Sequence, residues 1–174
     1  MTKQYADGTL PAPGVYGVPD QWPHVRAAFE QAGFVHDGHT EIVYLASSND
    51  LPGRGEAPDA GTSLRRSLGI NGTRFSAVLR DVVVGYIEVD LLQVGERLPR
   101  SGGWADIGNL HIAEEQRRQG VATWLIGQAA DWLRLANIDR LLAYAGPEQQ
   151  DCTAFYAKVG FRELARTQRG WVRR

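Results

Sequence analysis

The chain has 174 residues, of which 43% are hydrophobic and 22% charged, so it suits one domain or one domain with an appendage. Its formal net charge of -1, from 19 basic and 20 acidic residues, excludes a broadly basic surface, and we expect no nucleic-acid partner. A single cysteine excludes an intrachain disulfide, and no apolar run approaches the about 18 residues of a membrane span, so we expect a cytoplasmic protein without a membrane partner.

Residues 1–46 predict an extended arm, a helix and a hairpin. Proline and glycine dominate residues 10–16, which is typical of an extended arm. Pro23 suits the first turn of a helix, and Gly33 ends the apolar stripe of that helix. The pair Asp37-Gly38 is a favourable hairpin turn. We expect the two strands of the hairpin at residues 34–36 and 40–46.

Residues 47–61 combine glycine, proline and small polar side chains, which is typical of a linker. The composition therefore predicts three parts, with the main domain at residues 62–174. Strands are expected at residues 62–68, 74–79 and 82–92, although residues 64–68 also fit a helical turn.

The stretch from Ile107 to Ala136 reads as a strand, a glycine turn and a helix. Apolar residues recur every three or four positions from Val121 onward, so they share one face of a helix of about four turns. That face should pack on a sheet. The helix start, next to Gly120, then lies at the carboxyl end of the strand, with free backbone N–H groups and a positive dipole. Such a helix start binds an anion, most often a phosphate.

Two motifs resemble those of the GNAT family of acyl-CoA-dependent N-acyltransferases. Residues 117–122, RRQGVA, fit the Gln/Arg-x-x-Gly-x-Gly/Ala pattern of its pyrophosphate loop. Residues 154–161, AFYAKVGF, resemble its later helix, which ends in Tyr-x-Lys-x-Gly-Phe. The resemblance covers residues 62–174 and implies an α/β (α+β) fold, with a mixed, splayed central sheet flanked by helices. Residues 14–46 resemble the end of a second such half, as in tandem GNAT proteins.

The resemblance implies acetyl-CoA as co-substrate and no metal. Gln149 stands where the family often carries an asparagine that contacts the cofactor. In GNAT folds two neighbouring parallel strands splay apart and admit the pantetheine arm, and the second of these strands here is residues 141–145. The residues that the resemblance places around the cofactor are Leu110, His111 and Ile112 beside the arm, and Arg117, Arg118, Gln119, Gly120, Val121, Ala122 and Thr123 in the loop.

The resemblance further implies direct attack of an amine, in a small molecule or a peptide, on the acetyl thioester. Tyr156 matches the general acid of the family, and a phenol with a pKa of about 10 remains protonated at neutral pH. Asp106 and Glu88 are equal candidates for the base, because carboxylates within apolar strands have raised pKa values. Strand alternation turns His111 to the other face of the sheet. Cys152 is expected to be a buried, core-facing thiol.

Fewer than ten residues separate the first two strands of the main domain, where the family usually inserts one or two helices that wall the acceptor site. Residues 14–46 or a second subunit, in a homodimer, would have to replace that wall. A non-catalytic acyl-CoA-binding or assembly module of the same fold is the alternative hypothesis.

Overall fold

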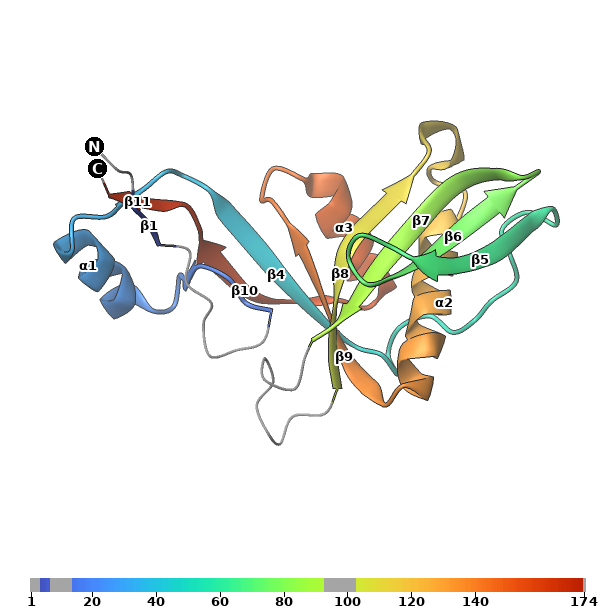
Figure 1. Cartoon of the computed structure of the whole chain (residues 1–174), viewed down its shortest axis with the longest axis horizontal. Helices are drawn as coiled ribbons and strands as arrows, with labels where there is room; N and C mark the ends of the chain where they lie inside the picture. Colours follow the sequence, from blue (N-terminus) through green and yellow to red (C-terminus); the bar gives the residue numbers. More distant parts are fainter. Residues whose placement is uncertain (1–3, 7–13, 93–102, 174) are drawn as a thin grey trace.

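The computed structural model describes residues 4–6, 14–92 and 103–173, which form two β-sheets and three α-helices (Figure 1). The large sheet has eight strands in the order β2-β10-β4-β9-β8-β7-β6-β5, and the small sheet has the order β1-β11-β3. The strands are β1 Gln4–Ala6, β2 Val18–Pro19, β3 Val35–His36, β4 Thr40–Ser47, β5 Thr62–Leu68, β6 Thr73–Leu79, β7 Val82–Leu91, β8 Gly103–Ile112, β9 Ile138–Ala145, β10 Arg162–Gln168 and β11 Trp171–Arg173. The helices are α1 Pro23–Gln31, α2 Val121–Leu135 and α3 Gln150–Val159, with a 3-10 turn η2 at Glu114–Gln116.

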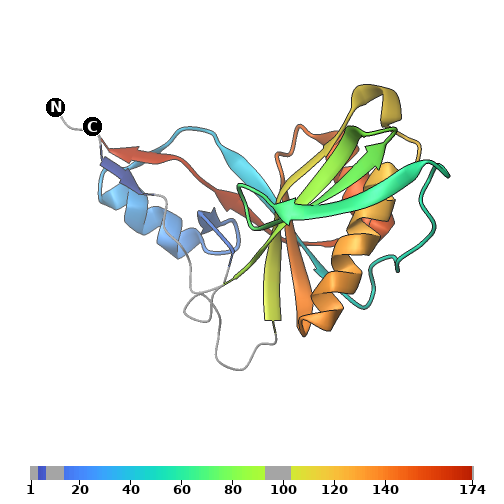
Figure 2. The same cartoon turned by 45° about the vertical axis from the view of Figure 1, so that its right-hand side comes forward.

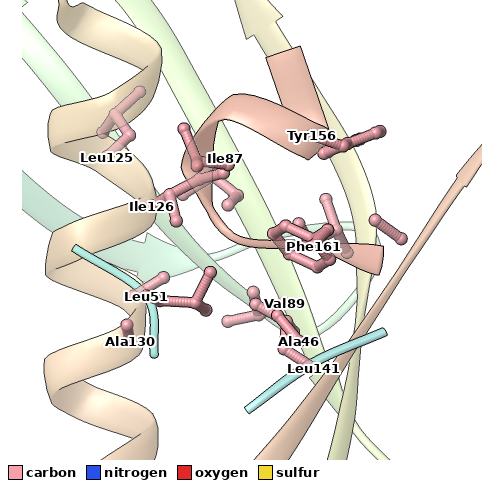
Figure 3. Packing of buried hydrophobic residues seen from close by; sticks show 14 of the residues in the cluster. Ala46, Leu51, Ile87, Val89, Leu125, Ile126, Ala130, Leu141, Tyr156 and Phe161 are labelled. Atoms are coloured by element: carbon pink, nitrogen blue, oxygen red, sulfur yellow. The ribbon is translucent and has the colours of Figure 1, made fainter. Parts of the chain in front are cut away.

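Helix α2 confirms the helix predicted after Gly120, and it packs on one face of the large sheet. Its apolar face is fully buried at Leu125 and Ile126. Ile87 and Val89 of β7 face these side chains in the same core, which continues to α3 (Figure 3). Each fully buried aliphatic side chain contributes roughly 1.5–3 kcal/mol to stability. This packing fixes the start of α2 at the carboxyl end of β8.

The opposite face of the sheet is covered by the segment just before β2. Val15 packs with Leu142 and Leu92 in a second buried cluster. Leu141 belongs to the main core and its neighbour Leu142 to this cluster, so the two clusters lie on opposite faces of β9. Gly14 has a φ of 68°, and a Cβ at this position would lie 2.8 Å from the hydroxyl oxygen of Tyr144. Only glycine fits the chain this closely against β9.

The N-terminal helix forms as predicted, but the hairpin after it does not. β3 and β4 do not pair with each other. Instead β4 inserts between β9 and β10 of the large sheet, while β3 pairs with β11 (Figure 2). Asp37 accepts a hydrogen bond from the His39 amide and donates its own N–H to the carbonyl of Gly170, so the turn bends the chain from one sheet into the other. In an isolated hairpin one edge of β4 would have no strand partner, whereas insertion into the large sheet pairs both edges of β4.

The segment predicted as a linker packs along α2. Arg134 donates hydrogen bonds to the carbonyls of Ser48 (2.9 Å) and Leu51 (3.1 Å), and the Trp124 indole donates to the carbonyl of Gly55 (3.2 Å). Leu51 is buried in the main core. The segment is therefore an ordered cover of α2, and the division at residues 47–61 stays a prediction. Residues 62–68 form the predicted strand rather than a helical turn.

Candidate functional site

Strands β8 and β9 are parallel neighbours that separate along their length. They pair only where Gly103–Asp106 meets Ile138–Leu142. Beyond Asp106, β8 continues to Ile112 and remains paired with β7 on its other edge. The edge that faces β9 is thus released over the second half of β8, where an extended ligand arm could form backbone hydrogen bonds. Leu110 and Ile112 pack against the core beside this gap, and His111 is exposed on the other face, as alternation predicted.

A β-bulge interrupts β8 at Gly108, within the released half. The pairing of β7 and β8 shifts between Glu88 and Val89, which leaves Gly108 as the extra residue. A side chain at Gly108 would collide with that of Asn71, from the turn between β5 and β6. The turn therefore lies directly over the bulge. The adjacent Asn109 is exposed and donates a hydrogen bond from its amide to the hydroxyl of Tyr86 at 3.0 Å.

The predicted phosphate loop follows β8. Arg118 has a φ of 61° and Gly120 a φ of 87°, so the chain turns sharply before α2 begins at Val121. The Trp124 N–H bonds to the Gly120 carbonyl at 3.0 Å and closes the first helical turn. The amides of Val121, Ala122 and Thr123 precede this bond and have no acceptor within the helix. They concentrate positive potential at the open end of the gap between β8 and β9.

The side chains of the loop do not fill the space in front of Gly120. Arg117 donates to the Ile112 carbonyl (3.3 Å) and Gln119 to the Glu115 carbonyl (2.6 Å), which ties the loop to the preceding chain. A Cβ at Gly120 would meet only the Cβ of Pro58, at 3.8 Å. Free amides and open space in front of a glycine fit a pyrophosphate group. The loop residues predicted from the sequence, Arg117 to Thr123, thus lie together in one turn, which we call the cradle, and its binding of an anion stays a prediction.

Tyr156 is buried on α3, with 6% of its surface exposed. Its ring packs 5.5 Å from that of Tyr44 and 5.2 Å from that of Phe161. Burial raises the pKa of Tyr156 well above its usual value, and Cys152 and Tyr44 add to the effect, so its hydroxyl is a permanent donor near neutral pH. The prediction of a buried Cys152 is wrong, because only Tyr156 and Val159 of α3 are buried, and Cys152 lies on the exposed side.

Asp106 lies at the last paired position before β8 and β9 separate. The single hydroxyl proton of Tyr144 is shared between the Gly14 carbonyl, at 2.7 Å, and the Asp106 carboxylate, at the longer distance of 3.3 Å. Burial and the nearby Asp106 carboxylate raise the pKa of Tyr144, which keeps the phenol protonated. Tyr144 could not be predicted as a site residue, because alternation gives its face of the sheet but not the strand neighbour that it meets.

Glu88 has a different environment from the one predicted. Its side chain is 1% exposed. Its carboxylate accepts a hydrogen bond from Arg74 Nε at 2.7 Å and forms an ion pair with Arg74 Nη2 at 2.6 Å. The amides of Ile70 and Asn71 donate to it at 3.2 and 3.4 Å. Burial raises the pKa of this carboxyl, but Arg74 and the two amides outweigh burial and lower it. The expected raised pKa is therefore wrong for Glu88, which holds the turn over the bulge instead.

Gln149 precedes α3 and is held in place by a local contact. Its side-chain oxygen accepts the Gly146 N–H at 2.9 Å. The residue borders a cavity of about 380 Å³ between the start of β4 and the loop after β9. Within the described residues, no three His, Cys, Asp or Glu side chains converge as metal ligands, and no helix is long and apolar enough to cross a membrane.

Comparison with known proteins identifies the family. The model of the acetyltransferase (GNAT) family matches residues 54–161, which is more than half of the chain. The chain belongs to this family, whose members transfer acyl groups from acyl-CoA. None of the curated proteins matches the sequence.

Solved structures share the fold at low sequence identity. A tandem GNAT protein from the clavulanic acid biosynthesis pathway, in a structure without AcCoA, matches 98% of this chain and 62% of its own, with 15% identity and a TM-score of 0.66. A GCN5-related N-acetyltransferase from Sphaerobacter thermophilus matches 89% of this chain and 56% of its own, with 13% identity and a TM-score of 0.61. The chain thus spans less than two thirds of either structure. These likenesses confirm the predicted splayed α/β fold.

Proposed function

We propose that the protein is an N-acetyltransferase that transfers acetyl from acetyl-CoA to an amine of a small molecule or a peptide, in the cytoplasm. The separation of β8 and β9 immediately before the Arg117–Thr123 cradle is the observation that carries this proposal. A diphosphate on the cradle would direct the extended arm of the coenzyme into the gap. The released backbone around Leu110 and Ile112 supplies the donors and acceptors for that arm.

Tyr156 is the proposed general acid. The amine nitrogen attacks the thioester carbonyl, the C–S bond breaks, and the sulfur leaves as a thiolate that needs a proton or a strong hydrogen bond. A thiol has a reference pKa of about 8.5 and a phenol about 10. Because burial raises the pKa of Tyr156 further, the phenol remains protonated and available throughout the neutral range. No covalent enzyme intermediate is required.

Asp106 is the proposed base. An alkyl amine with a pKa of about 10.4 is almost entirely protonated at neutral pH, so a carboxylate that accepts its proton promotes attack. Asp106 lies where the two strands separate, and the Tyr144 hydroxyl orients its carboxylate. Glu88 is less suitable, because four donor contacts stabilise its charged form.

A non-catalytic acyl-CoA-binding or assembly module is the second candidate. The short connection between β5 and β6 favours this candidate, because it is a turn and not the helices that usually wall the acceptor site. Gln149 also favours it, since its oxygen is occupied by the Gly146 amide. In the first candidate the wall comes from the N-terminal segment or from a second subunit in a homodimer.

Calorimetric titration with acetyl-CoA, CoA and ATP tests the proposal. Micromolar binding of acetyl-CoA without binding of ATP, followed by amine-dependent thiol release, is the expected result. Binding of acetyl-CoA without thiol release for any amine would favour the non-catalytic module. If neither coenzyme bound, the cradle would not be a coenzyme site and both candidates would fail.

A further inference from the structure

The cavity of about 380 Å³ lies at the carboxyl end of β9, the end at which β9 has separated from β8. Two segments far apart in the sequence form it. One is residues 38–41, where the N-terminal segment enters the large sheet, and the other is residues 144–149, which lead from β9 into α3. The inserted strand β4 therefore supplies a wall in a fold that lacks helices between β5 and β6.

Carboxylates from both segments border the cavity. Glu41 is 16% exposed and meets Arg169 at 3.3 Å, so its charge is partly balanced. Glu148 is exposed, and within the described part of the chain no cationic side chain pairs with it. Its carboxylate lies over Gly146, where it would collide with an added Cβ. Of the two carboxylates that line the cavity, Glu148 is therefore the one whose negative charge is not balanced.

The start of α3 contributes less positive potential than its position suggests. The Gln149 N–H donates to the Gly146 carbonyl and the Gln150 N–H to the Glu148 carbonyl, both at 3.0 Å. Two amides that could meet an anion are therefore occupied. A cationic group fits this wall better than an anionic one.

Tyr144 connects the cavity to the proposed base. It lines the cavity, and its hydroxyl donates to the carboxylate of Asp106. A molecule in the cavity would reach past Tyr144 toward the point where β8 and β9 separate. The amine that reacts must lose its proton, whereas an amino group beside the Glu148 carboxylate keeps its proton. These two requirements are met by different nitrogen atoms of one molecule.

We propose that this cavity binds a second, protonated amino group of the acceptor, so that the substrates are diamines or larger polycations. The inference rests on the proposed acetyltransferase function and specifies its substrate class. It assigns Glu148 as a specificity-determining residue, which acts on the acceptor and not on acetyl-CoA, while Glu41 is paired with Arg169.

The test compares 1,4-diaminobutane with butylamine, which has the same chain length but one cationic group. Each amine is titrated into the isotopically labelled full chain with CoA present, and the NMR shifts of backbone amides are followed. We expect 1,4-diaminobutane to bind about tenfold more tightly and to shift residues 38–41 and 144–149. Glu148→Gln should weaken this binding about threefold to tenfold, less at high salt, because the carboxylate is exposed.

The control is Glu30→Gln, which removes an exposed carboxylate of α1 and should leave binding of 1,4-diaminobutane unchanged. Equal affinity for the two amines, absence of shifts at the cavity, or an unaltered Glu148→Gln variant would overturn the inference. Calorimetry with acetyl-CoA on the same samples separates the two proposals. Unchanged coenzyme affinity with no preference for the diamine rejects only the acceptor subsite, whereas loss of coenzyme binding in the parent protein rejects the acetyltransferase itself.

Discussion

The two ends of the chain contain similar structural units, and the candidate site lies beside one of them. In the N-terminal unit, β1 and β3 flank α1, and β11 from the far end of the chain lies between them. In the C-terminal unit, β9 and β10 flank α3, and β4 lies between them. Each unit therefore takes its middle strand from the other unit, so the two units share their strands (Figures 1 and 2).

Equivalent positions in the two units are separated by the same 127 residues, from Phe29 to Tyr156 and from Phe34 to Phe161. The Phe34 N–H bonds to the Phe29 carbonyl at 3.0 Å, and the Phe161 N–H to the Tyr156 carbonyl at 2.9 Å. The inserted strands match as well. Trp171 lies 5.4 Å from Phe29, in the way that Tyr44, 127 residues earlier, lies 5.5 Å from Tyr156.

The difference between the units is chemical. Phe29 has the ring of Tyr156 without the hydroxyl, so the unit forms at this position without a phenol. β9 also has a parallel neighbour that leads into the cradle, which the described part of the N-terminal unit does not have. The ring belongs to the architecture that both units share, and the hydroxyl and the cradle belong to the function that we assign to one of them.

The largest effect is expected from Gly120→Glu. A side chain and a negative charge would fill the open space in front of the cradle, so acetyl-CoA binding should become undetectable by calorimetry. Gly33→Glu is the control, because Gly33 also has a positive φ, of 81°, but lies in the N-terminal unit. It should lose a similar amount of stability to backbone strain and keep its coenzyme affinity. Retained binding in Gly120→Glu would disprove the cradle.

Trp171→Ala should have the largest effect on stability among these variants. The side chain is 2% exposed and packs on Phe29, so its loss should lower the free energy of unfolding by about 3–5 kcal/mol. Val35→Ala, on the neighbouring strand but 71% exposed, should change it by less than about 0.5 kcal/mol. Urea denaturation measures both. Equal effects would mean that the exchanged strand does not hold the units together.

Tyr156→Phe makes the C-terminal unit chemically like the N-terminal one. Loss of the proposed general acid should reduce kcat about 100-fold and leave acetyl-CoA affinity unchanged. Tyr44→Phe is a matched control, because its buried hydroxyl has no hydrogen-bond partner among the described residues. Steady-state thiol release should show near-normal turnover for this control. If Tyr156→Phe turned over normally, the acid would have to be another group or water.

The local parts of this fold could be predicted from the sequence, and the strand exchange could not. The helix after Gly120 and the motif around Tyr156 are set by contacts between residues close in sequence. The pairing of β4 with β10 joins residues more than one hundred positions apart, such as Leu45 and Arg162, and alternation is the same whichever partner a strand finds. The turn at Asp37-Gly38 was correctly located, but its strands separate instead of pairing.

The candidate site, too, could be predicted only where its residues are close in sequence. The loop residues are consecutive in sequence, so the motif alone placed them together. The pKa of Glu88 depends on Arg74, on the facing strand, and on two amides of a turn, none of which can be assigned from its own strand. For the same reason it could not be predicted that Glu41 and Glu148, on separate segments, border one cavity.

Glu88→Gln should have the smallest effect of these variants. Glu88 lies on β7, in a part of the large sheet that has no counterpart in the small sheet. Gln keeps the shape but loses the charge that pairs with Arg74, so the free energy of unfolding should fall by about 2 kcal/mol at pH 7. Because folding lowers the pKa of Glu88, its contribution is present above the ordinary carboxyl pKa of about 4.3 and is lost as the pH falls below it. Urea denaturation at pH 7 and pH 3 should therefore show the difference from the parent protein shrinking in acid. Glu163→Gln removes an exposed carboxylate paired with Arg166 and should change stability little at either pH. A pH-independent deficit in Glu88→Gln would mean that the packing of the turn, and not the charge of Glu88, holds it over the bulge.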